Sequence, residues 1–305
     1  MIPENYLVLG GNGFIGRNLC TYIAEQGNKV TSFDHSLPEM PNSSVNYIQA
    51  DFFDDISLRQ IICSHDVIVH AISTINPGNS NELYIDGYRK DFVQTIKMCS
   101  WVKDTNKKIL FLSSGGTVYG NCEHQPISED TLPRPINHYG NIKLCIENAL
   151  RIFHIQNRLH VTIARISNPY GPGQDFRKGV GFVDAVLKQA LDNKSVDIWG
   201  DGNNIRDYIY IQDVCRILYV LSRYTGKELL FNVSSGKGTS QRQVIEAIEK
   251  LGIKVKVNYK KQRSVDVREI ILDNQKVLSV YKNKLLSFDE GIQKYYRHLL
   301  QQKGI

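Results

Sequence analysis

Glycines at positions 10, 13 and 16 stand between the first apolar run of the chain and its first amphipathic stretch. The apolar run, Tyr6 to Gly10, has the length of a buried strand, and Phe14 to Glu25 carries apolar residues at helical spacing. Glycines at these points let the backbone approach a pyrophosphate, and the helix that follows presents free N–H groups to the phosphates. The strand, turn and helix together predict a dinucleotide-binding unit of the α/β class.

Strand-length apolar runs alternate with helix-length stretches through the first half of the chain. Such alternation predicts a parallel sheet with right-handed crossovers and helices on both faces, which is a Rossmann-type doubly wound fold. Ligands of such sheets bind at the carboxyl ends of the strands. The expected strands are Tyr6 to Gly10, Lys29 to Phe33, Val45 to Gln49, Asp66 to His70, Lys108 to Leu112 and His160 to Ile166. The expected helices are Phe14 to Glu25, Ser57 to Cys63, Ile85 to Val102 and Tyr139 to Gln156.

The pattern changes after Ile166, where loops rich in Gly, Asn and Pro separate shorter elements. We therefore expect two portions: residues 1–167 as the dinucleotide-binding domain, and residues 168–305 as a smaller, mixed α/β portion that mainly binds substrate. The two should pack intimately, with some crossing of the chain between them.

The second expected strand leads into Asp34, which lies 24 residues after Gly10. A carboxylate at this place accepts hydrogen bonds from both ribose hydroxyls and repels a 2′-phosphate. The sequence therefore favours NAD(H) as the cofactor, with NADP(H) kept as the alternative.

Tyr139 and Lys143 are four residues apart at the start of an expected helix, so both project from one face. A free tyrosine has a pKa of about 10 and is a poor base at neutral pH. A neighbouring ammonium would stabilise the phenolate and lower that pKa. The pair could then exchange a proton with a substrate hydroxyl while a hydride moves to or from the nicotinamide.

The order of several motifs resembles that of the extended short-chain dehydrogenases, in particular the NAD-dependent epimerase/dehydratase family. The chain looks similar to its UDP-glucose 4-epimerases and dTDP-4-keto-6-deoxysugar reductases over nearly its whole length. The segments that carry the resemblance are Gly10 to Gly16 (GGNGFIG), Ser113 to Gly120 (SSGGTVYG), Tyr139 to Lys143 (YGNIK), Asn168 to Gly173 (NPYGPG) and Arg206 to Ile209 (RDYI).

This resemblance implies roles for individual residues. For the cofactor, it places Asp51 and Phe52 beside the adenine and Ile72 and Ser73 near the ribose. The complete set implied to bind the cofactor is Gly10, Gly13, Phe14, Ile15, Gly16, Asp34, Asp51, Phe52, Ile72, Ser73 and Lys143.

The resemblance also implies a nucleotide-diphosphate sugar as substrate. Asn168, Arg206 and Arg263 fall where the family binds the diphosphate, and guanidinium groups suit that task because they grip phosphate bidentately. Trp199 lies where an aromatic side chain often contacts the base, although a core position explains it equally well. The family usually pairs two long helices across a dimer axis, here Ile85 to Val102 and Tyr139 to Gln156, which implies a homodimer.

The chain departs from the family at the residue three places before Val118. Relatives carry there a Ser or Thr that hydrogen-bonds the reacting oxygen, whereas this chain has Gly115. Thr117, or else Ser114, must then supply the hydroxyl, and we expect Thr117 because the neighbouring glycines would let the loop present it. A further departure is Asp91, which stands where relatives often have Asn.

The dehydratases of the family carry Asp-Glu directly after that hydroxyl, where this chain has Gly116 and Thr117. Elimination of water would lack its acid and base here, so a 4,6-dehydratase is disfavoured. Two enzyme activities remain, a 4-ketoreductase acting on a 4-keto-6-deoxy sugar and a UDP-hexose 4-epimerase with tightly bound NAD. The short chain and Gly115 favour the reductase slightly. A dinucleotide-sensing protein without catalysis is a third interpretation, which Tyr139 and Lys143 argue against.

Composition excludes several other classes. The net charge of +6 is spread thinly, and a basic stretch such as Lys254 to Arg263 is typical of a solvated face, so we expect no nucleic-acid partner. No apolar run reaches membrane-spanning length. The six cysteines do not stand at metal-ligand spacing, which predicts buried thiols and a cytoplasmic location without a metal site.

Overall fold

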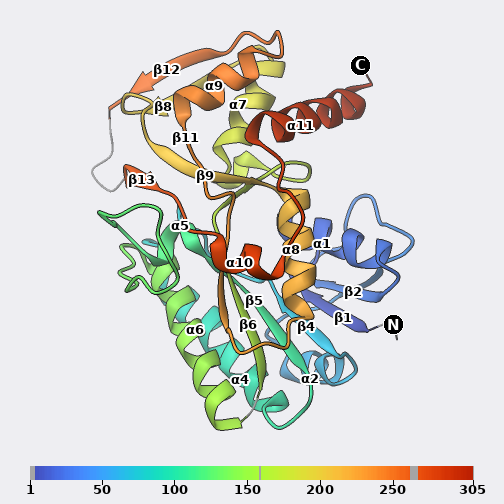
Figure 1. The fold of residues 1–305 in the computed structure, drawn as a ribbon. Coiled ribbons are helices and arrows are strands. Elements are labelled where there is room, and N and C mark those ends of the chain that lie inside the picture. The colour runs from blue at the N-terminus through green and yellow to red at the C-terminus, as the bar shows by residue number, and fades with distance from the viewer. Residues whose placement is uncertain (1–3, 158, 262–266, 305) are drawn as a thin grey trace.

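The structure is a computed structural model that describes residues 4–157, 159–261 and 267–304. These residues form a seven-stranded parallel sheet in the order β10-β6-β5-β4-β1-β2-β3 (Figure 1). The predicted Rossmann-type α/β fold is therefore confirmed. Its strands are β1 (Asn5–Leu9), β2 (Lys29–Asp34), β3 (Asn46–Gln49), β4 (Val67–His70), β5 (Lys108–Ser114), β6 (His160–Ile166) and β10 (Leu230–Val233).

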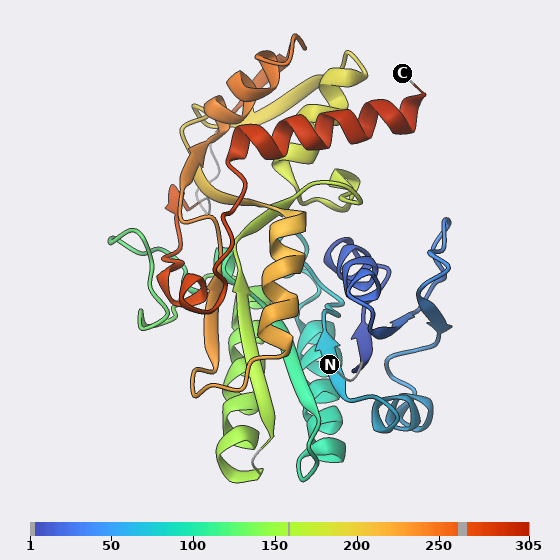
Figure 2. The ribbon, with the colours of Figure 1, turned by 45° about the vertical axis from the view of Figure 1, so that its right-hand side comes forward.

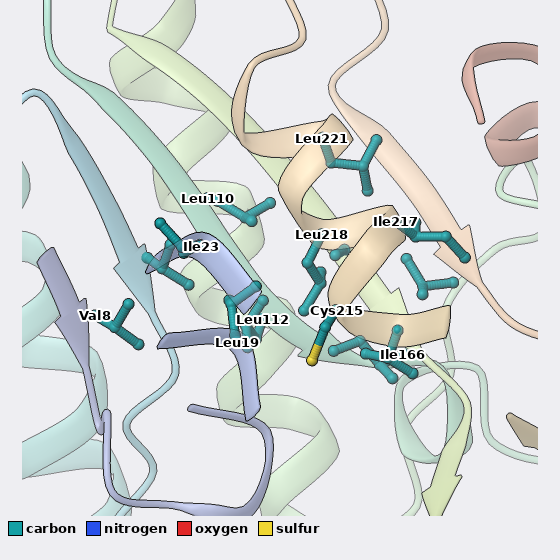
Figure 3. Close-up of a cluster of buried hydrophobic side chains, with 14 of the residues drawn as sticks. Val8, Leu19, Ile23, Leu110, Leu112, Ile166, Cys215, Ile217, Leu218 and Leu221 are labelled. Atoms are coloured by element: carbon teal, nitrogen blue, oxygen red, sulfur yellow. The ribbon is translucent and has the colours of Figure 1, made fainter. Parts of the chain in front are cut away.

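Helices α1 (Phe14–Glu25) and α8 (Ile211–Ser222) cover one face of this sheet. Their apolar residues recur at helical spacing and meet the strands in one buried cluster, drawn in Figure 3. Leu19 and Ile23 of α1 lie there beside Leu110 of β5, and Leu218 of α8 closes the cluster from the other side. Because α8 follows residue 167, the later part of the chain helps to build the core of the large sheet.

The opposite face is covered by α2 (Asp55–Cys63), α4 (Val93–Val102) and α6 (His138–Asn157). The side chain of Asp54 caps α2 by accepting hydrogen bonds from the amides of Ile56 and Ser57. With helices on both faces, the strands of the sheet are buried along most of their length, except for the edge strand β3.

The helix expected from Ile85 to Val102 is not a regular α-helix. It consists of α3 (Tyr84–Gly87), a π-helical turn η1 (Tyr88–Phe92) and α4. A π turn inserts one residue into the helical repeat and is found often at functional sites. In this protein it contains Asp91, whose buried carboxylate bonds to the loop that follows β4.

The remaining elements stack beyond the carboxyl ends of the parallel strands (Figure 2), because β6 leads directly into β7 (Asn168–Tyr170). In the described part of the chain they include a four-stranded sheet, in which β9 (Ile205–Tyr210) pairs with β7, β11 (Gly238–Ser240) and β13 (Glu269–Ile270). Strands β8 (Ser195–Trp199) and β12 (Lys256–Lys260) form a separate parallel pair. The helical segments are α5 (Gly115–Val118), η2 (Phe176–Lys178), α7 (Phe182–Leu191), α9 (Gln241–Glu249), α10 (Gln275–Val280) and α11 (Phe288–Lys303).

The chain returns to the large sheet twice after residue 167. It does so first as α8 and β10, which follow one another, and β10 pairs with β6. It returns again at α10, whose Val277 packs in the same buried cluster as α8. The boundary near residue 167 stays a prediction. None of the helices among the described residues is long and apolar enough to cross a membrane.

Candidate active site

The glycine-rich turn lies at the carboxyl end of β1. The amides of Gly10 and Gly11 both donate to the carbonyl of Phe33, which holds the turn against β2. A Cβ at Gly16 would stand 2.2 Å from the carbonyl oxygen of Gly10, so a side chain there would fill the turn. Helix α1 starts directly after Gly13, and no side chain among the described residues caps it. The turn therefore presents bare backbone close to a helix N-terminus, which suits the pyrophosphate of a dinucleotide.

Asp34 ends β2 beside this turn. One carboxylate oxygen accepts the amide of Asn12 at 3.1 Å, and the other lies 2.6 Å from Nδ1 of His35. The Asp34 side chain is only 10% exposed, whereas that of His35 is 88% exposed. A negative group is thus fixed next to the phosphate-binding turn, at the position where the sequence predicts the ribose hydroxyls.

The other residues expected at the cofactor lie along the same edge of the sheet. A Cβ at Gly10 would come within 3.2 Å of Cγ1 of Ile72, so Ile72 and the glycine turn are neighbours. Ser73 is exposed and donates its hydroxyl to Asp91. Asp51 is exposed and accepts the amide of Phe53, whereas the ring of Phe52 is buried against His70. The structure therefore brings Ile72 to the turn and directs the Phe52 ring into the core.

Tyr139 and Lys143 lie one turn apart on α6, at the carboxyl end of β5. The Lys143 side chain is buried, and its Nζ donates to the carbonyl of Leu112 at 3.2 Å. The same Nζ lies 5.6 Å from the centre of the Tyr139 ring. Burial lowers the pKa of Lys143 to about 8, while the carboxylates of Asp91 and Glu147 act in the opposite direction.

The Tyr139 phenol differs from the expectation that Lys143 would lower its pKa. Burial first, and the carboxylate of Asp91 second, raise the pKa of Tyr139 to about 12, and a hydrogen bond with the side chain of Ser114 acts against them. The physical reason is that desolvation and a like charge disfavour the phenolate. Tyr139 is thus a neutral phenol, ready to donate a proton.

The two candidate hydroxyls occupy different surroundings. Ser114 is the residue before α5, and its hydroxyl does not cap that helix; a hydrogen bond of its side chain acts to lower the pKa of Tyr139. Oγ1 of Thr117 is buried and has no hydrogen-bond partner within the described residues. These surroundings favour Ser114 over Thr117 as the hydroxyl that assists Tyr139. The sequence analysis favoured Thr117, because the neighbouring glycines would let the loop present it.

Asp91 is a site residue whose role the sequence did not reveal. Its carboxylate accepts the hydroxyl of Ser73 at 2.9 Å and the amide of Thr74 at 3.0 Å, and it is almost fully buried. The only feature of the sequence that drew attention to position 91 is that it carries Asp where relatives often have Asn. Asp91 raises the pKa of both Tyr139 and Lys143 from its place in the π turn. The spacing of apolar residues in the sequence does not predict that turn.

The residues expected to bind the sugar nucleotide lie on the second portion. Asn168 of β7 stands opposite Tyr208 of β9, and its side-chain amide donates to the carbonyl of Asp207. Arg206 lies on the same strand, and its Nη1 donates to the carbonyl of Ile205 at 2.7 Å. The structure therefore brings Asn168 and Arg206 onto adjacent strands. Trp199 ends β8 with 37% of its surface exposed, so it is not a core residue, and Arg263 lies outside the described residues.

His70 does not take part in this site. His70 is buried between Phe52 and Phe111, and burial lowers its pKa to about 3, so the ring is neutral. No cluster of three or more His, Cys, Asp or Glu side chains in the described ranges could hold a metal ion.

Comparison with known proteins agrees with this geometry. Residues 6–234 match the model of the NAD dependent epimerase/dehydratase family. The chain is 30% identical to the dTDP-4-dehydro-6-deoxyglucose reductase of Escherichia coli, with 96% of each chain covered. It is 29% identical to a putative UDP-glucose 4-epimerase of Methanocaldococcus jannaschii, over 94% of this chain and 96% of the relative.

Among solved structures, the UDP-glucose 4-epimerase of Thermotoga maritima with UDP-glucose is similar, with a TM-score of 0.92 and 27% identity. The match covers 98% of this chain and 99% of that one. The family match spans the glycine turn, Asp34, and the Ser114, Tyr139 and Lys143 group described above. The chain therefore belongs to the NAD dependent epimerase/dehydratase family, and it is an NAD-dependent enzyme of the group that contains nucleotide-sugar reductases and 4-epimerases.

Proposed function

We propose that the protein transfers a hydride at C4 of a nucleotide-activated hexose, as a reductase of a 4-keto-6-deoxy sugar. The observation that carries this proposal is the placement of Tyr139 and buried Lys143 one helical turn apart on α6, with the Lys143 Nζ 5.6 Å from the centre of the Tyr139 ring. This group stands at the end of β5, on the edge of the sheet that also holds the glycine turn. This common edge supports the proposal that proton transfer and cofactor binding take place next to one another.

The chain's own residues supply the proton and hold the sugar oxygen. NAD(H), held by the glycine turn and Asp34, supplies the hydride chemistry when it is bound. In the reductive direction C4 gains a hydride and its oxygen gains the phenolic proton of Tyr139, so the ketone becomes a secondary alcohol. Ser114 would hydrogen-bond the same oxygen, and the Lys143 ammonium would stabilise the phenolate that is left.

One observation supports the reductive direction. The Escherichia coli relative is named a dTDP-4-dehydro-6-deoxyglucose reductase and is covered almost completely.

A 4-epimerase is the second candidate, because the names of the Methanocaldococcus jannaschii and Thermotoga maritima relatives support it equally well. An epimerase would use the same residues in both directions. Tyr139 would first accept the proton of the C4 hydroxyl and later return it on the other face of the sugar.

Elimination of water is disfavoured in either case. The positions after Gly115 carry Gly116 and Thr117, and neither offers a carboxyl acid or base. The Oγ1 atom of Thr117 is also buried, away from any partner in the described part of the chain.

The substrate's diphosphate would lie against Asn168 and Arg206, whose strands adjoin at the carboxyl end of the large sheet. Trp199 is exposed enough to contact the nucleotide base. A role for Arg263 and a cytoplasmic location stay predictions.

A homodimer formed through α4 and α6 is also part of the proposal. The two helices pack against one another, and they leave the apolar side chains of Val93, Ile152 and Ile155 exposed. Exposed apolar side chains on two neighbouring helices favour burial against a second copy.

The decisive experiment uses purified protein with dTDP-4-keto-6-deoxyglucose and NADH, and follows the loss of NADH absorbance. Sustained turnover identifies the reductase. Absence of oxidation, together with NAD released only on denaturation and interconversion of UDP-hexoses, identifies the epimerase. A protein that binds NAD and turns over neither class of sugar contradicts the proposal and supports the sensing alternative.

A further inference from the structure

Gly115 is a glycine for reasons of space and not of backbone conformation. It is absent from the glycines with positive φ in the described chain, so its backbone would accept any L-residue. A Cβ built on it would stand 2.3 Å from Cδ1 of Leu272, whereas the carbonyl oxygens of Arg165 and Ile166 would lie at 3.3 and 3.4 Å. The obstacle to a side chain at position 115 is therefore the leucine.

The Leu272 side chain cannot easily move away from Gly115. It is fully buried in a cluster with Tyr119, Ile127 and Ile270. Its amide donates to the carboxylate of Asp207, and its carbonyl accepts the hydroxyl of Ser234. The residues on both sides of it are hydrogen-bonded to Ile127. A packed side chain on a fixed backbone moves only at a cost, so the space above Gly115 stays filled.

The two serines before Gly115 interact with different residues. Ser113 donates its hydroxyl to the buried carboxylate of Glu147, further along α6. Ser114 ends β5, directly before α5, and a hydrogen bond of its side chain acts to lower the pKa of Tyr139. Relatives carry a Ser or Thr at the position of Gly115. Because Gly115 has no side chain, no hydroxyl from that position competes with the hydroxyl of Ser114.

We propose that Leu272 is a positioning residue, which excludes a side chain at position 115 and thereby assigns to Ser114 the hydroxyl that assists Tyr139. The steric part stands on this geometry alone. The catalytic part rests on the proposed function.

Thermal unfolding tests the steric part without any substrate. Gly115→Ser should lower Tm by at least about 4 °C, because the core has no room for the added atoms. In the Leu272→Ala background the same substitution should change Tm by less than about 1 °C, because the space is then open. Gly116→Ser is the matched control for stability, since its Cβ would meet, among the described residues, only Oδ1 of Asn168 at 3.8 Å. If Gly115→Ser lowers Tm equally in both backgrounds, Leu272 does not exclude a side chain at position 115.

Steady-state kinetics test the catalytic part. Ser114→Ala should reduce kcat about 100-fold in the natural protein, as expected for loss of one hydrogen bond to a reacting oxygen. In the Gly115→Ser/Leu272→Ala background it should cost less than about 5-fold, because the introduced hydroxyl takes over. An undiminished 100-fold loss in that background would overturn the assignment. If no nucleotide sugar is turned over, the proposed function fails, and the Tm comparison still decides whether Leu272 excludes a side chain.

Discussion

Glu147 and Arg165 form a buried bidentate ion pair, with 2.6 Å between Nη2 of Arg165 and Oε2 of Glu147. Their side chains are 0% and 2% exposed. Glu147 lies one turn beyond Lys143 on α6, and Ser113 of β5 donates to the same carboxylate. The pair therefore ties α6 to β5 and β6 immediately behind Tyr139 and Lys143, and holds the catalytic helix in register with the sheet.

Glu147→Ala should lower the free energy of unfolding by about 3–5 kcal/mol, because it leaves the Arg165 guanidinium charged and buried without its partner. Denaturant unfolding measures this loss. The control is Asp192→Ala, which breaks an ion pair of the same 2.6 Å length with Lys303 at the surface. That change should leave the free energy of unfolding almost unchanged, because water screens an exposed pair. Equal losses in the two variants would contradict the structural role of the buried pair.

Tyr139→Phe should reduce kcat by about 100-fold or more, because the proton donor is removed while the ring remains. Calorimetry should find NAD bound as tightly as in the natural protein, since Asp34 and the glycine turn are unchanged. Tyr259→Phe removes an exposed phenol and serves as the control. Activity that survives Tyr139→Phe would show that another group supplies the proton.

Asp91→Asn should move the alkaline limb of the reduction to lower pH. The Asp91 carboxylate raises the pKa of both Tyr139 and Lys143, so its neutralisation lowers both values. The two groups then lose their protons at lower pH, and reduction declines earlier as pH rises. A pH profile of kcat/KM checks this shift, with Asp86→Asn, at the exposed ion pair with Lys90, as the control. A shift to higher pH would contradict the electrostatic role of Asp91.

Asp34→Asn should weaken the preference for NADH over NADPH by at least about tenfold, equivalent to about 1.4 kcal/mol. The variant retains an acceptor for the Asn12 amide but loses the charge that repels a 2′-phosphate. The ratio of kcat/KM for the two cofactors measures the effect. An unchanged ratio would mean that Asp34 does not face the ribose.

Ile155→Arg should convert a dimer to a monomer, because a charge would be buried between α6 and the second copy. Light scattering after size exclusion gives the mass. Ile56→Arg is the control, since that residue is 83% exposed on α2, away from the proposed interface. A monomeric natural protein, or dimers of both variants, would contradict the interface.

Much of the fold follows from local patterns. Helix α1 starts and ends at the predicted residues, and all six predicted strands agree within two residues at each end because buried parallel strands read as continuous apolar runs. The loop-rich region after Ile166 gave no comparable signal, so α8 and β10 were not foreseen. Their places depend on contacts with residues far away in the chain, such as the packing of α8 against α1 and the pairing of β10 with β6.

The sequence by itself determined the dinucleotide turn, the charge at Asp34 and the spacing of Tyr139 and Lys143, because each depends only on residues near one another in the chain. Tertiary structure alone decided which groups surround Gly115 and Tyr139. Leu272 fills the space above Gly115 from a distant segment, and Asp91 reaches the site through a π turn. Desolvation and excluded volume are set by whichever atoms surround a group, and local sequence does not specify those atoms.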